Sequence, residues 1–143
     1  MSVTVRQMIA GRGPVIAVSP STTVFESLQR MAEHNVGAVL VMSGDTLAGI
    51  FTERDYARKV ALRGLVSKTV PVSDLMTAKV YTIDLSWTAD QCLALMNEQQ
   101  IRHLPVVEGG EVASVISIRD AVKAIVNEQQ FVIGQLVNYI TSS

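Results

Sequence analysis

The stretch GAVLVMSGDTLAGIFTERD, residues 37–55, contains two apolar runs separated by a glycine turn and ends in a hydroxyl and a carboxylate three positions apart. Short apolar runs bounded by turn residues predict two buried strands. The last four residues, TERD, match the capping pattern that begins a helix. The stretch therefore predicts a β-β-α unit with Thr52 and Asp55 at the turn from strand to helix.

The same pattern returns 65 positions later in IRHLPVVEGGEVASVISIRD, residues 101–120, where Ser117 and Asp120 align with Thr52 and Asp55. The alignment needs no gap over residues 15–55. Near the start of the chain the offset becomes 67, and VRQMIA lies over VSDLMT. Self-similarity over this length indicates a tandem duplication of a unit of roughly 60 residues.

Each unit begins with a short β-rich run, VIAV at 15–18 and VYTI at 80–83, and continues into an amphipathic helix. Thr23 with Glu26, and Thr88 with Gln91, are expected to form capping boxes at the starts of those helices. The order β-α-β-β-α in each unit predicts an α/β protein of the α+β type, with helices packed on small sheets. We expect the first repeat at 1–65, the second repeat at 66–127 and a C-terminal helical extension at 128–143.

Composition excludes several classes of protein. The chain has 143 residues, 48% of them hydrophobic, and a formal net charge of -1, so no bulk field attracts nucleic acid or an anionic membrane. No apolar run is long enough to span a bilayer, and the first residues lack the apolar core of a secretory signal. The single cysteine, Cys92, suits a reducing compartment. We expect a cytoplasmic protein that binds neither nucleic acid nor membrane.

No catalytic constellation is visible in the sequence. His34 and His103 stand apart from other metal-ligand residues, Cys92 has no nearby partner, and no glycine-rich phosphate-binding fingerprint is present. We therefore expect a protein that is not an enzyme and requires no cofactor or metal.

The duplicated stretches 37–55 and 101–120 resemble a pair of cystathionine-β-synthase (CBS) domains, also called a Bateman module, and the resemblance covers Val5 to about Asn127. It implies a pseudo-twofold pair of units that assembles as a disc-like homodimer. It also implies binding of adenosine-containing ligands, namely AMP, ADP, ATP, NAD(H) or S-adenosylmethionine, in clefts between the repeats. The second repeat departs from the family pattern at Ser114, where the first has the usual glycine, Gly49.

In such proteins the motif aspartate accepts hydrogen bonds from the ribose hydroxyls, and basic residues at the positions of Arg102 and His103 meet the phosphates. The resemblance implies two unequal clefts, one around Asp120 with Ile16 and the turn near Ser19, the other around Asp55 with Tyr81 stacked on a base. Plain helix capping and solvent-exposed cations remain the alternative for the same residues. The candidate ligand-binding residues are Thr52, Arg54, Asp55, Tyr81, Arg102, His103, Ser117, Arg119, Asp120, Ile16 and Lys68.

These expectations describe an energy or redox sensor, a regulatory module whose nucleotide changes its affinity for a partner protein. The alternative is a ligand-free interaction or dimerisation module that uses the C-terminal helix and regulates a redox partner such as thioredoxin. Apolar residues at 122–140 form a helical stripe with one slip around Gln129, longer than one helix buries on a small domain. Truncation after Asn127 separates the two hypotheses, because only the alternative requires the tail.

Overall fold

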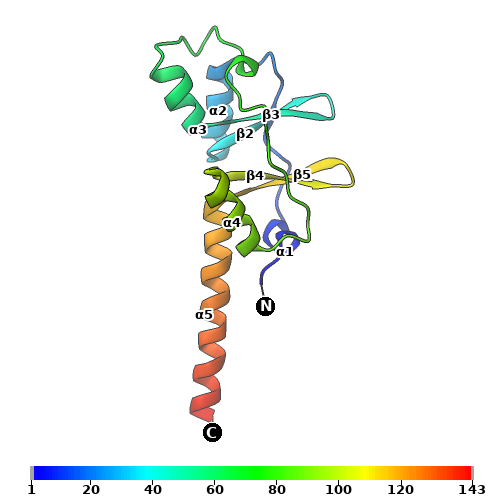
Figure 1. The fold of residues 1–143 in the computed structure, drawn as a ribbon, viewed down its shortest axis with the longest axis vertical. Coiled ribbons are helices and arrows are strands. Elements are labelled where there is room, and N and C mark those ends of the chain that lie inside the picture. The colour runs from blue at the N-terminus through cyan, green and yellow to red at the C-terminus, as the bar shows by residue number, and fades with distance from the viewer. Residues whose placement is uncertain (1, 143) are drawn as a thin grey trace. The chain divides into compact units, whose positions relative to one another are not determined.

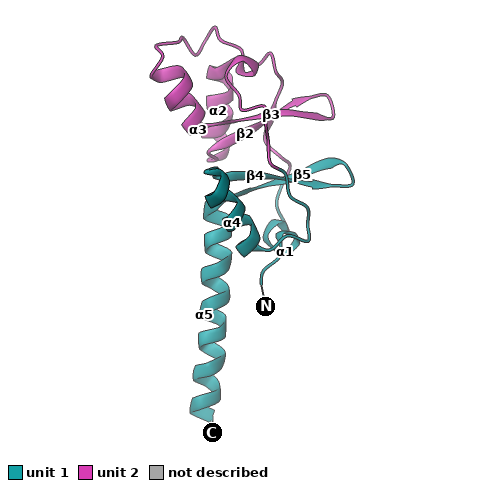
Figure 2. Ribbon diagram, in the orientation of Figure 1, with its two compact units in different colours: residues 1–13, 82–143 teal, residues 14–81 magenta. Residues whose placement is uncertain are grey.

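The computed structural model describes residues 2–142 and divides them into two compact units (Figures 1 and 2). Unit 2 consists of residues 14–81, and unit 1 consists of residues 1–13 together with 82–143. The N-terminal segment therefore packs with the second repeat, and residues 66–81 pack with the first. The mixed architecture of helices and two small sheets confirms the predicted α+β class.

Unit 2 is built on a three-stranded sheet in the order β1 (Ala17–Val18), β2 (Ala38–Ser43) and β3 (Thr46–Thr52). Strand β1 runs parallel to β2, and β2 pairs with β3 as an antiparallel hairpin. Gly44 closes the hairpin with a φ of 61°, a left-handed conformation that favours glycine. The hairpin ends at Thr52 and so delivers the chain directly into the motif.

Helical segments cover this sheet. They are α2 (Val24–His34), α3 (Glu53–Asp55), the π-helical segment η1 (Tyr56–Ala61) and the 3₁₀ turn η2 (Val72–Asp74). The buried core combines apolar residues from every layer: Val24, Met31, Val39, Val41, Phe51, Val60, Val72 and Leu75.

Unit 1 repeats the plan with one hairpin, β4 (His103–Glu108) and β5 (Glu111–Ser117), and three helices, α1 (Val5–Ile9), α4 (Ala89–Gln99) and α5 (Ile118–Ser142). Backbone hydrogen bonds attach the N-terminal segment to this unit, from Val5 N to Trp87 O at 2.7 Å and from Ala89 N to Val3 O at 2.8 Å. The buried apolar residues of the unit are Val5, Ile83, Leu85, Ala89, Cys92, Met96, Leu104, Val106, Ile116 and Ala121.

The two early strands are shorter than predicted, and the second is reduced to one parallel bridge between Ile83 and Val106. In unit 2, Leu40 N donates to Ile16 O at 3.1 Å and supports β1. The residue aligned with Leu40 is Pro105, which has no N–H to donate. Proline in β4 therefore stops the pairing from extending back to Tyr81.

The predicted caps of the two long amphipathic helices are present. Thr88 forms the full reciprocal capping box with Gln91, whereas at Thr23 only half of the predicted box is present, the hydrogen bond from Glu26 N to the Thr23 hydroxyl. These bonds satisfy backbone groups at the helix start that have no partner inside the helix.

Helix α5 continues without a break through the slip that the sequence shows near Gln129. Residues 129–142 are exposed along their whole length, and Figure 1 shows this part of α5 extending away from the rest of unit 1. No helix within residues 2–142 has the length and apolar character needed to cross a membrane.

Candidate nucleotide-binding motifs

The first motif lies where β3 turns into α3. Thr52 Oγ1 accepts a hydrogen bond from Asp55 N at 3.1 Å, and Asp55 Oδ2 accepts one from Thr52 N at 3.0 Å. The Thr52 hydroxyl also donates to the same Oδ2 at 3.1 Å. The predicted capping box is therefore present, and it fixes the orientation of a carboxylate that is 9% exposed.

The second oxygen of Asp55 is held by side chains instead of backbone. Thr77 Oγ1 donates to Asp55 Oδ1 at 3.1 Å, and Lys59 Nζ lies 3.1 Å from the same atom. Lys59 Nζ also donates to Thr77 Oγ1 at 3.3 Å, which closes a three-membered polar cluster.

Gly49 explains why Thr77 reaches this position. The segment around Thr77 pairs with β3 through an antiparallel bridge, with two backbone hydrogen bonds between Thr77 and Ile50 at 2.8 and 3.0 Å. A Cβ at position 49 would lie 2.6 Å from Met76 Sδ and 2.8 Å from Thr77 O. Glycine at this position therefore permits the close approach that brings the Thr77 hydroxyl to Asp55.

The second motif has the same internal geometry at the start of α5. Ser117 Oγ accepts from Asp120 N at 3.1 Å, and Asp120 Oδ2 accepts from Ser117 N at 2.8 Å. The other oxygen, Oδ1, lies 2.8 Å from Nη2 of Arg12. The same guanidinium donates through Nη1 to Val115 O at 2.8 Å, so Arg12 joins the N-terminal segment to both β5 and α5.

The pKa of Asp120 lies below its ordinary value. Partial burial acts to raise this pKa, but the backbone hydrogen bond from Ser117, the hydrogen bonds from Arg12 and Ser117, and the charge of Arg12 together outweigh it. The carboxylate is therefore ionised at neutral pH, and both of its oxygens are hydrogen-bond acceptors.

In unit 1 the structure brings five of the predicted site residues to one end of the hairpin. His103 pairs with Ser117 in the strand register, and Arg102 O accepts from Ile118 N at 2.8 Å. Arg102 and Arg119 are both exposed, and His103 is half-buried. Three basic residues thus come from backbone positions that adjoin the Ser117–Asp120 turn.

In unit 2 the predicted residues are more dispersed. Arg54 is exposed and lies next to Asp55 on α3. Lys68 lies over the ring of Phe25, with Nζ 5.1 Å from the ring centre. Half-buried Tyr81 has Lys79 Nζ 5.8 Å from its ring centre, and Ile16 packs against the core of the unit.

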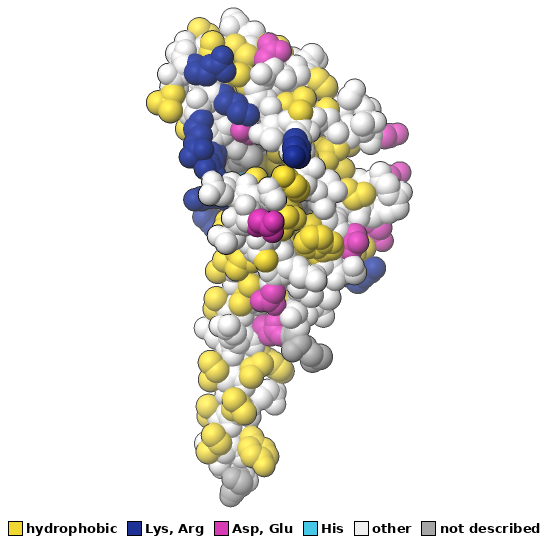
Figure 3. All heavy atoms as spheres, in the orientation of Figure 1, with side chains coloured by type: hydrophobic (Ala, Val, Ile, Leu, Met, Phe, Trp, Pro, Cys, Tyr) yellow, Lys and Arg dark blue, Asp and Glu magenta, His cyan; other side chains and the backbone are white. Residues whose placement is uncertain are grey.

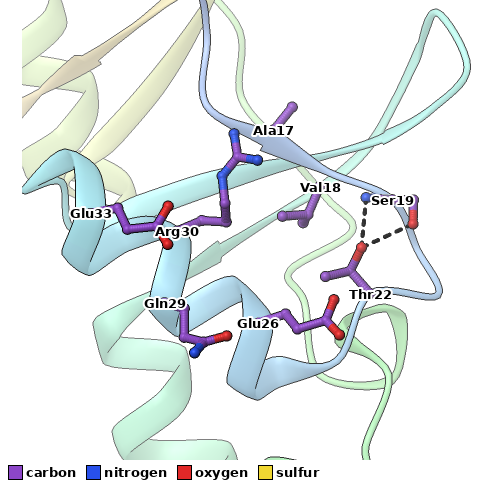
Figure 4. Close-up of a pocket in the computed structure, with 8 residues that line it drawn as sticks. All are labelled: Ala17, Val18, Ser19, Thr22, Glu26, Gln29, Arg30 and Glu33. Carbon is purple, nitrogen blue, oxygen red and sulfur yellow. Dashed lines mark hydrogen bonds between the residues drawn. The ribbon is translucent and has the colours of Figure 1, made fainter.

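A hollow of about 410 Å³ lies between β1 and α2 within unit 2 (Figure 4). It includes the turn that the sequence analysis associated with a cleft, where Ser19 N and Ser19 Oγ both reach Thr22 Oγ1, at 3.1 and 3.0 Å. Glu26 and Glu33 line it, opposed by one cation, Arg30. This charge balance suits a sugar or a base better than a phosphate.

Sequence reasoning missed three residues of the motifs: Arg12, Lys59 and Thr77. Lys59 follows Asp55 by four positions, the spacing of an ion pair on one helix face, and was therefore detectable. Thr77 belongs to the VSDLMT segment whose alignment with the N-terminus was recognised. Arg12 carried no local signal, because its partners lie more than one hundred positions along the chain.

Within residues 2–142, the metal-ligating side chains do not cluster and Cys92 is buried. Residues 2–142 contain no group of three or more histidine, cysteine and acidic side chains placed to hold a metal ion. Cys92 is buried on α4, and this burial raises the pKa of its thiol to about 11.

Comparison with known proteins gives these motifs a family. The model of the CBS domain matches twice, at residues 5–62 and 72–127. The mitochondrial CBS domain-containing protein CBSX3 of Arabidopsis thaliana is 37% identical over 123 residues, which cover 82% of this chain and 60% of that protein. The chain thus spans less than two thirds of this relative's length.

Two solved structures have the same fold. A protein with CBS domains from Burkholderia ambifaria is 43% identical, with a TM-score of 0.84, and the match covers 89% of this chain and 96% of that one. The CBS domain protein PAE2072 from Pyrobaculum aerophilum, solved in complex with AMP, is 24% identical, with a TM-score of 0.73 over 82% of this chain and 89% of that one. Two family matches in tandem, a duplicated fold and a Thr/Ser-x-x-Asp turn in each repeat show that this chain belongs to the CBS-domain family as a tandem pair.

Proposed function

We propose that this chain is a regulatory module that binds an adenosine-containing ligand, such as AMP, ADP, ATP or NADH, through Asp55 and Asp120. The bound nucleotide changes the conformation that a partner protein recognises, so the module senses energy or redox state. No catalytic step is part of the proposal. A cytoplasmic location and a homodimeric assembly are part of it.

The observation that carries the proposal is that the two oxygens of each carboxylate have different kinds of hydrogen-bond partner. In both motifs Oδ2 is fixed by the backbone N–H of the capping residue, at 3.0 Å for Asp55 and 2.8 Å for Asp120. In both, Oδ1 is occupied by groups on side chains that can move, Lys59 and Thr77 in one and Arg12 in the other. A ribose diol needs such an ionised acceptor, held rigidly and with one oxygen open to exchange.

The internal cations give a reason for the ligand to carry phosphate. A ribose hydroxyl that replaces Arg12 on Asp120 Oδ1 leaves a guanidinium without its carboxylate, and a phosphate can take that place. Arg102, His103 and Arg119 adjoin the same turn, so the Asp120 motif has basic side chains nearby in addition to Arg12. We therefore expect the Asp120 motif to prefer a mononucleotide, whereas a dinucleotide such as NADH would draw on the cations of both motifs.

The relative solved with AMP supports an adenine nucleotide as the ligand class. The regulatory role follows from linkage: a nucleotide that binds two conformations with different affinity shifts their populations, and a partner that binds one of them reads the shift.

Calorimetric titration of the full chain with AMP, ATP, NADH and S-adenosylmethionine tests the proposal. Asp120→Asn and Asp55→Asn remove the charge but keep an amide oxygen for the cap. Loss of hydrogen bonds to a charged group is worth about 1.5–3 kcal/mol, so each change should weaken binding at its own motif roughly 10- to 100-fold. Asp45→Asn, in the exposed hairpin turn next to Gly44, is the matched control and should bind as the wild type does. Binding that survives both motif substitutions refutes the assignment.

The exposed apolar length of α5 favours a second candidate function, a protein-interaction module that needs no nucleotide and regulates a redox partner. Truncation after Gln130 tests it better than truncation after Asn127, because Glu128 Oε2 accepts a hydrogen bond from Val3 N at 3.3 Å and should be retained. A truncated chain that binds nucleotide normally supports the sensor. A chain that binds no nucleotide at any length but loses its partner on truncation supports the alternative.

A further inference from the structure

The last part of α5 presents large apolar side chains to solvent. Phe131 is 66% exposed, Leu136 is 58% exposed and Ile140 is 70% exposed. Figure 3 shows apolar side chains along the extended lower part of this helix. Exposed apolar surface of this extent on a monomer marks a contact with another molecule.

The apolar residues follow the period of a coiled coil. One line along α5 alternates steps of four and three residues: Val122, Val126, Gln129, Ile133, Leu136 and Ile140. This line is termed the α5 seam. A 3.5-residue period keeps one face of the helix against a partner helix. Isoleucine alternates with leucine at Ile133, Leu136 and Ile140, a pattern that favours a parallel coiled coil of two helices.

The seam is also open along the first half of α5. A shallow hollow there is lined by Ile118, Arg119, Val122, Lys123, Val126 and Asn127. Val122 and Val126 are each 43% exposed, although they belong to the part of α5 nearest the core of unit 1. The line that could receive a partner is therefore continuous from Val122 to Ile140.

Charge decides which partner fits. Residues 129–143 contain no lysine, arginine, histidine, aspartate or glutamate. Helices that lie on membrane surfaces carry lysine and arginine on their polar face, and this one has none there. A charged partner helix would find no complementary charge along the same length. The surface suits another uncharged helix with the same period, and a second copy of α5 is such a helix.

We infer that α5 pairs with α5 of a second copy of this chain as a parallel, two-stranded coiled coil along the seam. Ile133, Leu136 and Ile140 form the apolar contact. Gln129 meets its counterpart, and this one polar pair fixes the register, since a shift would bury the amide against apolar side chains. The pairing rests on the homodimer of the proposed function and names one surface that holds it, but it requires no nucleotide, so nucleotide titration and cross-linking test the two separately.

Cysteine cross-linking tests the pairing directly. In a parallel pair Leu136 faces its counterpart, so Leu136→Cys should form an intermolecular disulfide under mild oxidation. Phe131 is exposed on the same helix but lies about half a turn away from the seam, so Phe131→Cys is the matched control. Native Cys92 is buried and stays out of the reaction. We expect covalent dimer to form at least tenfold faster with Leu136→Cys. Equal rates for the two variants, or no cross-link at position 136, overturn the inference.

Sedimentation velocity of the full chain provides the second measurement. Leu136→Glu places a charge in the seam and should lower the mass of the assembly, whereas Phe131→Glu adds the same charge on the far side and should leave the mass unchanged. Both substitutions lie in the exposed part of the helix, and circular dichroism verifies that unit 1 stays folded. An assembly that Leu136→Glu leaves intact overturns the inference. A second result would also overturn it: the wild type floats with neutral phosphatidylcholine vesicles and Leu136→Glu does not. The seam would then bind lipid.

Discussion

The Arg12 guanidinium lies 2.8 Å from Asp120 Oδ1 and donates at the same time to Val115 O at 2.8 Å. It occupies the carboxylate oxygen that the proposed ribose contact requires, so a cation from the N-terminal segment and the ligand compete for one atom. In unit 2, Lys59 holds the corresponding oxygen of Asp55 at 3.1 Å. The two repeats thus reached the same arrangement with cations from different parts of the chain.

Arg12→Met should reduce the preference for AMP over adenosine. The substitution keeps most of the side-chain length but removes both the competitor for Asp120 and the cation that would meet a phosphate. We expect Arg12→Met to bind adenosine more tightly than the wild type does. The ratio of AMP affinity to adenosine affinity should fall by up to roughly tenfold, as is typical when a partly exposed charged contact is lost. Parallel calorimetric titrations with the two ligands measure this ratio. Lys123→Met, an exposed cation on the same unit, is the control. A preference for AMP that is the same in wild type and Arg12→Met contradicts the competition.

Asp120 should make stability depend on pH at the acid end. Its pKa is lowered in the folded chain, so its contribution to the free energy of unfolding is fully present above the unfolded-state pKa, about 4. The contribution is lost as the pH falls through the lowered folded value. We expect the difference in unfolding free energy between wild type and Asp120→Asn to be constant from neutral pH down to about pH 5 and to shrink below about pH 4. Urea unfolding at a series of pH values measures it, and a difference that grows towards acid pH contradicts the sign.

Gly49→Ala should destabilise unit 2 and disturb its motif together. The added Cβ would meet Thr77 O at 2.8 Å, and a backbone carbonyl cannot move aside as the end of a flexible side chain can. Overpacking of this kind costs about 1–3 kcal/mol. Thermal unfolding of Gly49→Ala and of Gly13→Ala, where nothing lies within 4 Å of the added Cβ, provides the comparison. Equal melting temperatures would show that β3 and the Thr77 segment can separate freely.

Cys92 should be unreactive while the chain is folded. Burial raises the pKa of its thiol to about 11, so the reactive thiolate is scarce at pH 8 and reagents cannot reach it. We expect the single thiol to react with a chromogenic disulfide reagent only after addition of denaturant. Rapid reaction in native buffer would mean that α4 opens easily.

The sequence predicted the parts of the fold that depend on neighbours along the chain. The hairpins that end at Thr52 and Ser117 and both motif caps were readable, because strand patterns, glycine turns and capping boxes are local signals. The shortening of the early strand in unit 1 could also have been predicted, because Pro105 occupies a position where a backbone N–H donor is needed.

Contacts between distant segments were not predictable in the same way. Nothing in residues 1–13 shows that Val5 N bonds to Trp87 O, or that Arg12 reaches Asp120, because no periodicity links segments so far apart. The predicted site residues accordingly included both aspartates but omitted the side chains that contact their Oδ1 atoms. The exposure of residues 129–142 resolved another question, since the apolar stripe alone did not reveal whether the helix packs on its own chain.

The assignment of residues 1–13 to unit 1 also constrains the order in which the chain can fold during synthesis. All of unit 2, residues 14–81, emerges from the ribosome before residues 82–143 do, so its core can assemble first. Residues 2–13 are synthesised before unit 2, but they cannot pack until Trp87 and Ala89 are available for their backbone hydrogen bonds and Asp120 for its ion pair with Arg12. A nascent chain stalled when residues 14–81 have emerged but most of 82–143 has not should therefore protect unit 2 from proteolysis, while residues 2–13 remain open to cleavage.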